Sequence, residues 1–211
     1  KDVPIMVITN LSSDLSTSKV FKKLMTFETV GWHLSFDNVG EHYEYVRQGS
    51  NWQVFNNNIK ILGDAIGSIP NCKHYLKIMS VLNLLNITHL DTLKAFSKQI
   101  VSDYLPPRWP TESIEIIWQP CLMPHEISLT HFGSDFVSIF IDSIKGYLGQ
   151  GVQDSEKTFF TTILEQLDSN MQQPTTEKQK EMLNKWIQMN AEYFNNKGCF
   201  SKLYPEFSKL L

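Results

Sequence analysis

The spacing of the apolar residues changes near residue 50, and this change constrains the fold more than any other feature of the chain. Before it, apolar and polar residues alternate as they do in strands. Residues 3–8, 30–36 and 42–47 therefore predict three strands, the last two joined by the turn-forming sequence Asp-Asn-Val-Gly. Ser and Thr at 16–18 predict the start of one short helix between the first two strands.

After residue 50 the apolar residues recur every three to four positions, which is typical of helices. Residues 75–85 are apolar on nearly every side, so we expect a central, buried helix there. Other helices are expected over 51–69, from Thr88 to the prolines at 106–107, and over 134–148, 155–171, 177–195 and 202–211, with one strand at 113–118.

These patterns predict an α+β fold that is mostly α. A small α/β subdomain would occupy residues 1–50, and a helical core domain with the added strand at 113–118 would occupy residues 51–211. The chain has 211 residues, of which 42% are hydrophobic, and this supplies enough apolar material for a sizeable core.

The charge of the chain argues against a nucleic-acid or membrane partner. The formal net charge is −3, and Arg47 and Arg108 are the only arginines. Binding to nucleic acid or to an anionic membrane needs clustered positive charge. No apolar run approaches the roughly 20 residues of a membrane span. We therefore expect a protein partner, and neither nucleic acid nor a membrane.

Cysteine usage indicates a reducing compartment. The three cysteines lie far apart, at 72, 121 and 199, and form no CxxC pair. Two glycosylation sequons begin at Asn10 and Asn86, but Asn86 closes a strongly apolar segment where a glycan would clash with packing. We therefore favour the cytoplasm or nucleus over secretion.

One group of residues could support catalysis. His33, Asp37, Glu41 and His42 crowd the two strands predicted around the turn, and paired carboxylates with histidine are used in general acid–base chemistry. His33-Leu-Ser also resembles half of the duplicated motif of two-histidine phosphodiesterases, although no second copy follows. A hydrolase or phosphodiesterase is the enzymatic alternative. Side chains that merely face water are the simpler interpretation.

No metal or cofactor is expected. His125, Glu126 and His131 superficially resemble a zinc-hydrolase helix, but that site needs histidines four apart and these are six apart. The glycines at 146, 149 and 151 follow a predicted helix and do not link a strand to a helix, so they predict no phosphate-binding loop.

The sequence Pro-Pro-Arg-Trp-Pro at 106–110 is the strongest candidate for partner binding. Its prolines hold the segment extended, and Arg108 and Trp109 belong to the residue types most enriched at interface hot spots. Alternatively, Trp109 folds back as a lid on the core. Phe200, Tyr204 and Phe207 near the C-terminus could form a second binding surface.

Three short segments resemble a known family. Val-Pro-Ile-Met-Val-Ile at 3–8, Leu-Ser-Phe-Asp-Asn-Val-Gly-Glu at 34–41 and Arg-Trp-Pro at 108–110 follow the same order in phlebovirus nonstructural proteins, the interferon antagonists of that group. That family usually continues the last element with Gly-x-Pro, where this chain has Thr-Glu-Ser, and many members end in an acidic tail that is absent here. The resemblance implies a non-enzymatic protein that captures host factors.

Together these observations favour a soluble, non-enzymatic protein-interaction module, of the kind that a viral accessory protein provides. Arg108 and Trp109 are its leading anchors, and self-association is a further option because five tryptophans are spread along the chain.

Overall fold

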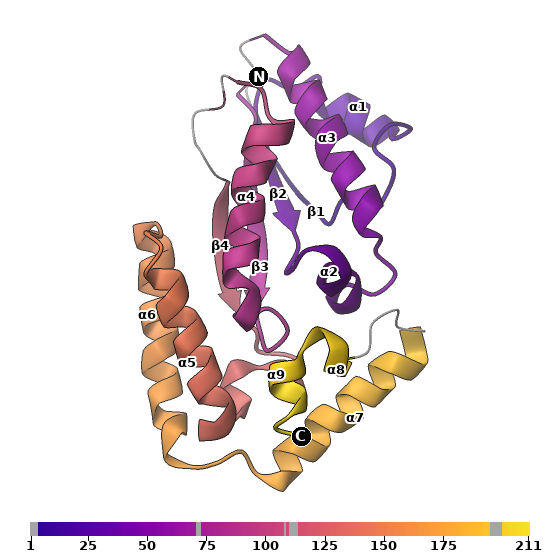
Figure 1. The fold of residues 1–211 in the computed structure, drawn as a ribbon. Helices are drawn as coiled ribbons and strands as arrows, with labels where there is room; N and C mark the ends of the chain where they lie inside the picture. The colour runs from indigo at the N-terminus through magenta and orange to yellow at the C-terminus, as the bar shows by residue number, and fades with distance from the viewer. Residues whose placement is uncertain (1–3, 71–72, 108, 110–113, 195–199) are drawn as a thin grey trace.

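The computed structural model describes residues 4–70, 73–107, 109, 114–194 and 200–211 (Figure 1). A parallel sheet of four strands forms the centre of the first half of the chain. The strands are β1 (Ile5–Thr9), β2 (Val30–Ser35), β3 (Tyr75–Leu82) and β4 (Glu115–Pro120). They lie in the order β1-β2-β3-β4, and every neighbouring pair is parallel. The domain boundary expected at residue 50 would therefore separate β1 and β2 from β3 and β4 of the same sheet.

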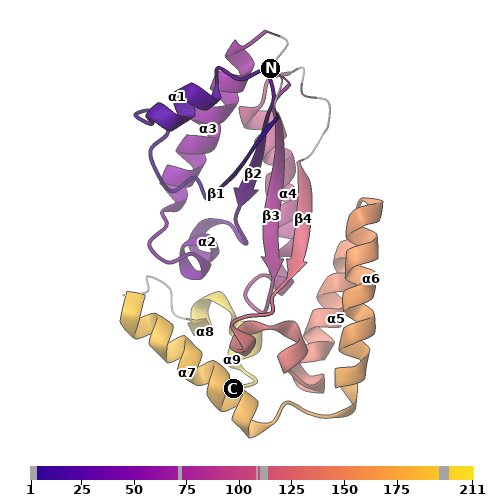
Figure 2. The same ribbon diagram turned by 180° about the vertical axis from the view of Figure 1, so that it is seen from behind.

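The helices that connect the strands lie on one side of this sheet. They are α1 (Lys19–Leu24), α2 (Gly40–Val46), α3 (Trp52–Ser68) and α4 (Leu90–Tyr104). Connections between parallel strands are almost always right-handed, so a sheet whose strand order never reverses receives its helices on a single face. Figure 1 shows α3 and α4 in front of the sheet, and Figure 2 shows the opposite side, where no helix of the described residues lies in front of β2, β3 and β4.

Side chains that point toward these helices form the core of the first half. Trp32 and Leu34 of β2 and Ile78 of β3 are at most 2% exposed. Ile116 and Trp118 of β4 are also buried. Residues between them along each strand are less buried, as the two-residue period of a strand requires.

β3 stands where residues 75–85 predict a central helix, so that prediction is wrong. Leu76, Ile78, Ser80 and Leu82 are buried and alternate with more exposed residues, which gives a period of two. The alternate positions include Met79 and Val81, so the strand carries apolar side chains on both faces. A short run of this kind cannot be distinguished from a buried helix by periodicity alone.

Residues 42–47 lie mostly in helix α2 and form no strand. Tyr43 and Tyr45 alternate in the sequence as strand residues do, but both rings are buried from a helix of seven residues. The Tyr43 ring packs against Phe55 of α3 at 5.0 Å, and the Tyr45 ring packs against Tyr204 at 5.7 Å. Contacts between aromatic residues far apart in the sequence thus stabilise this segment as a helix, although its local alternation predicts a strand.

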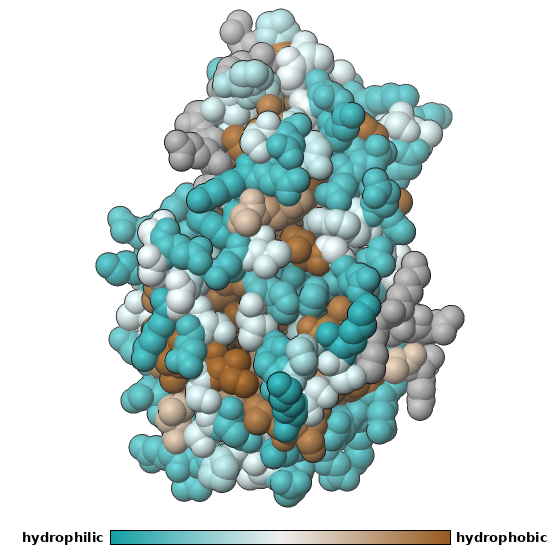
Figure 3. Space-filling view, in the orientation of Figure 1, coloured by the Kyte–Doolittle hydropathy of each residue, from teal (hydrophilic) through white to brown (hydrophobic). Residues whose placement is uncertain are grey.

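The second half of the described chain is helical. Its helices are α5 (Ser134–Leu148), α6 (Asp154–Asp168), α7 (Glu177–Phe194), α8 (Phe200–Leu203) and α9 (Pro205–Ser208). Phe136 and Phe140 of α5 pack against Phe207 of α9, with ring centroids 5.9 and 5.8 Å apart. The side of the molecule that carries α3 and α4 is mostly hydrophilic, and its hydrophobic patches gather mainly in the lower half (Figure 3).

The fold is therefore α+β and mostly α, as the sequence predicts. The strands near residues 3–8, 30–36 and 113–118 and the helices after residues 51, 88, 134, 155 and 177 are confirmed.

Candidate functional site

The four residues proposed for catalysis do not form one cluster. His33 lies on the side of β2 that faces away from the helices. Asp37 is 6% exposed, forms an ion pair with Arg47 at 2.9 Å and accepts a hydrogen bond from the backbone N–H of Val81 at 2.7 Å. The Asp37 carboxylate therefore ties α2 to β3, which is a structural role.

Glu41 and His42 face the C-terminal segment. Glu41 forms an exposed ion pair with Lys202 at 3.1 Å. Nε2 of His42 lies 3.0 Å from the carbonyl oxygen of Leu203, and the centroid of its ring lies 4.1 Å from that of His89, with the two rings tilted against each other. His33, Asp37, Glu41 and His42 thus have separate partners, and the geometry does not support the hydrolase or phosphodiesterase alternative.

The C-terminal aromatic residues lie inside the molecule. Phe200 is 5% exposed, and Tyr204 and Phe207 are 0% exposed. The Tyr204 ring packs against His42 and His89 at 5.3 and 5.8 Å. The expectation of an exposed second surface is corrected, because these rings fill the core between α2, α5 and the loop after β3.

The proline-rich segment is described only in part. Trp109 is half-buried and packs against the core, and its backbone N–H donates to the carbonyl oxygen of Pro106 at 2.8 Å. This position agrees with the lid interpretation of Trp109. Arg108 lies outside the described residues, so its proposed role as an anchor stays a prediction.

A buried carboxylate joins α5 and α6 of the second half to α4 and β4 of the first half. Glu156 of α6 is 1% exposed and accepts hydrogen bonds from the Lys94 ammonium at 2.9 Å and from the Tyr147 hydroxyl at 2.5 Å. The indole N–H of Trp118 also points at it, at 3.4 Å. Burial opposes ionisation of Glu156, but these donors hold the pKa of its carboxyl below the usual value. The carboxylate is fully occupied by the protein itself, so we assign it to stability.

The side of the sheet that faces away from the helices, which we call the open face, takes part in none of these contacts. Because paired residues of neighbouring strands point to the same side, the register places its side chains in rows across the sheet. The rows are Met6, Gly31 and Tyr75; Ile8, His33, Lys77 and Glu115; Ser35, Met79 and Ile117; and Val81 and Gln119.

Much of the open face is apolar and accessible. Met6 is 60% exposed, Ile8 61% and Tyr75 40%. All-parallel sheets occur almost only where both faces are covered, and strands covered on both faces are apolar at consecutive positions. β1 has this sequence, Ile-Met-Val-Ile-Thr, although among the described residues its Met6 and Ile8 side chains remain exposed.

Charges on the open face are few and balanced. Lys77 and Glu115 form an ion pair at 2.7 Å between β3 and β4. Partial burial lowers the pKa of His33, and the neighbouring Lys77 ammonium lowers it further. The Tyr75 ring lies across Gly31, where a Cβ atom would come within 2.3 Å of the ring. The face is thus a mixed surface, with these few charges in a middle row and exposed apolar side chains toward its periphery.

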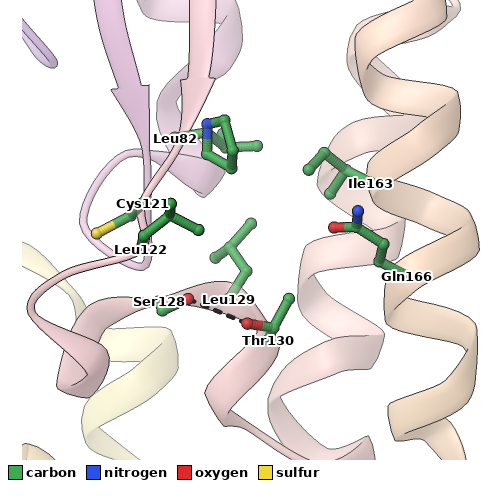
Figure 4. A pocket seen from close by; sticks show the side chains of 9 residues that line it. Leu82, Cys121, Leu122, Ser128, Leu129, Thr130, Ile163 and Gln166 are labelled. Atoms are coloured by element: carbon green, nitrogen blue, oxygen red, sulfur yellow. Dashed lines mark hydrogen bonds between the residues drawn. The ribbon is translucent and has the colours of Figure 1, made fainter.

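A smaller apolar feature lies at the carboxyl ends of β3 and β4, beside α6 (Figure 4). The pocket encloses about 450 Å³ of empty space, part of it open to solvent. Hydroxyl groups of Ser128 and Thr130 lie 3.1 Å apart at its floor, and burial raises the pKa of the Cys121 thiol. The lining residues are Leu82, Pro120, Cys121, Leu122, Ser128, Leu129, Thr130, Ile163 and Gln166. This lining could hold a small apolar group, and it provides no acid–base pair.

Within the described residues, no three His, Cys, Asp or Glu side chains gather closely enough to hold a metal ion. None of the helices in that part of the chain is both long and apolar enough to cross a membrane.

No protein-family model, no curated protein and no solved structure matches this chain. The function is therefore inferred from the residues and contacts of the chain itself.

Sequence reasoning missed the open face. The signal was present in β1, where apolar residues at consecutive positions predict a strand covered on both sides. The sequence alone does not reveal this face, because residues 75–85 predict a helix. The predicted sheet therefore lacks β3, which lies between β2 and β4.

Proposed function

We propose that this chain is a non-enzymatic protein-interaction module that binds another protein through the open face. The observation that carries the proposal is the side of an all-parallel sheet that no helix of the described residues covers, with Met6, Ile8 and Tyr75 between 40% and 61% exposed. Parallel sheets are normally covered on both sides, and exposed apolar patches of this kind mark interaction sites.

The resemblance to phlebovirus nonstructural proteins gives this proposal a direction. It suggests a viral accessory protein whose partner is a host factor. A reducing compartment, the cytoplasm or nucleus, agrees with the buried and unpaired Cys121. Asn86 is 1% exposed and donates a side-chain hydrogen bond to the carbonyl oxygen of Val81 at 2.8 Å, so its sequon has no room for a glycan.

An affinity pull-down tests the proposal. The variant carries Tyr75→Glu and Met79→Glu, which place an acid on either side of Lys77 on the open face of β3. The two changes remove apolar contact area and add charge that a partner would have to desolvate. We expect the partners captured by the unchanged chain to be lost, with a melting temperature within a few degrees of the original.

The matched control carries Val20→Glu and Met189→Glu. These side chains are 69% and 61% exposed, on α1 and α7, so the control makes the same change of charge away from the open face. It should capture the same partners as the unchanged chain. Equal capture by both variants would refute the open face as the binding surface.

A further inference from the structure

β1 ends the strand order and leaves one edge of the sheet without a neighbouring strand in the described residues. The backbone N–H of Ile5 donates to Thr29, on the side of β2, at 3.3 Å. Successive residues of a strand direct their backbone groups to opposite sides. The N–H and C=O groups of Met6 and Ile8 therefore point outward from the free edge.

Residues Ile5–Thr9 lack several of the features that usually prevent edge-to-edge pairing. Natural edge strands are blocked by lysine, proline, bulges or inward-pointing charge. Residues Ile5–Thr9 have none of these, and Pro4 lies just before the strand. Met6 and Ile8 are 60% and 61% exposed, so the edge also presents accessible apolar side chains.

The residues of this edge are complementary to themselves. In an antiparallel pair of two β1 strands related by a two-fold axis at Val7, Met6 lies opposite Ile8 of a second copy, and Ile8 lies opposite its Met6. The outward backbone groups of these two residues would then form about four hydrogen bonds. Val7 would face its own copy on the helix-covered side. No like charges meet anywhere in this pairing.

We propose that two copies of this chain associate through antiparallel pairing of their β1 edges, centred on Val7. The two sheets then form one continuous sheet of eight strands, and the two open faces lie side by side on the same surface. The inference goes beyond the proposed function, because it concerns the free edge of β1 and a second copy of the chain. A partner bound to the open face would meet a surface twice as wide.

Sedimentation velocity of the full chain, at roughly 5–200 µM, tests the pairing, since an interface this small gives a weak, concentration-dependent dimer. One variant carries Met6→Lys and Ile8→Lys, and a second carries Met6→Glu and Ile8→Glu. Each variant alone should stay monomeric, because four like charges would meet at the edge. An equimolar mixture should dimerise, because each lysine then lies opposite a glutamate.

Two outcomes overturn the inference: an unchanged chain that stays monomeric throughout this range, or a dimer that persists in both edge variants. Recovery of the dimer on mixing also shows that both variants are folded. The Tyr75→Glu, Met79→Glu variant should dimerise normally, because β3 is two strands away from the edge. If the chain stays monomeric but still captures a partner through the open face, only the self-pairing is refuted.

Discussion

His89 shows how one buried side chain makes stability depend on pH. Its ring is mostly buried against His42, at 4.1 Å, and Nδ1 lies 3.1 Å from the hydroxyl of Thr88. Burial lowers the pKa of His89 to about 4, with a further contribution from His42 that Glu206 opposes. In the unfolded chain the same group titrates near pH 6.5.

We expect acid to weaken the fold through this group. Above pH 6.5 His89 is neutral in both states and contributes no pH dependence. Between pH 6.5 and about 4 the unfolded state binds the proton and the native state does not, so stability falls as the pH falls. At pH 5 the loss should be about 2 kcal/mol, measured by urea unfolding at pH 7.5 and 5.0.

The His89→Gln variant isolates this contribution. His33 and His131, whose pKa values burial also lowers, titrate in both proteins and cancel in the comparison. The variant should lose about 2 kcal/mol less than the unchanged chain between the two pH values. An equal loss in both proteins would show that His89 is not responsible.

Acid should not release the C-terminal segment on its own. Phe200, Leu203, Tyr204 and Phe207 are all buried, and exposing them would cost roughly 6–12 kcal/mol at 1.5–3 kcal/mol for each side chain. Protonation of His89 supplies only a fraction of this amount. We therefore expect the whole fold to weaken with these residues still docked.

Among the helices, α3 and α4 approach each other closely at a glycine. A Cβ atom at Gly63 of α3 would lie 1.8 Å from the carbonyl oxygen of Tyr104 in α4. At Gly67, one turn later in the same helix, a Cβ atom would meet only the Cβ of Pro106, at 3.8 Å. Gly63 therefore leaves no room for a methyl group, whereas Gly67 in the same helix leaves room for one.

Alanine at these two positions should have opposite effects on the free energy of unfolding. Gly63→Ala should destabilise the protein by about 1–3 kcal/mol or more, because the helices must separate to admit the methyl group. Gly67→Ala should be neutral or stabilise it by up to about 1 kcal/mol, since alanine favours helix. Denaturant unfolding of both variants measures the difference, and similar effects would contradict the close contact.

Elements with a strong local signal could be predicted from the sequence. Asn51 caps α3 by accepting a hydrogen bond from the N–H of Val54, and Ser18 caps α1 in the same way. β3 could not be predicted as a strand, because apolar residues on both of its faces hide the two-residue period. α2 depends on aromatic contacts with residues far away in the sequence, such as Tyr45 with Tyr204. A local sequence pattern cannot predict such contacts.

The candidate site was less predictable than the fold. Phe200, Tyr204 and Phe207 were expected on the surface, but an aromatic cluster looks the same in a sequence whether it fills a core or an interface. His33 and His42 are close in the sequence yet have different partners, because the chain turns from β2 into a helix between them. Only the strand register shows which residues share the open face.

At the scale of the whole molecule, strand order determines where a partner could bind. Because the strands follow one another from β1 to β4, their connecting helices lie on one side, and no helix of the described residues covers β2, β3 and β4 on the other. The helices of the second half pack at one edge of the sheet and beyond its end, where α6 meets β4 through Glu156 and Trp118. The open face thus follows from topology, and its exposed apolar residues are the basis for proposing a partner there.

Site-specific photo-crosslinking in cells shows whether a partner protein contacts the open face. A photoreactive residue would be placed at Tyr75 or Ile117 on the open face, or at Val20 or Met189 on the exposed helix surfaces. We expect one common partner protein to be crosslinked from both open-face positions and from neither helix position. The same partner crosslinked from Val20 or Met189, and not from Tyr75 or Ile117, would contradict the open face as the binding surface.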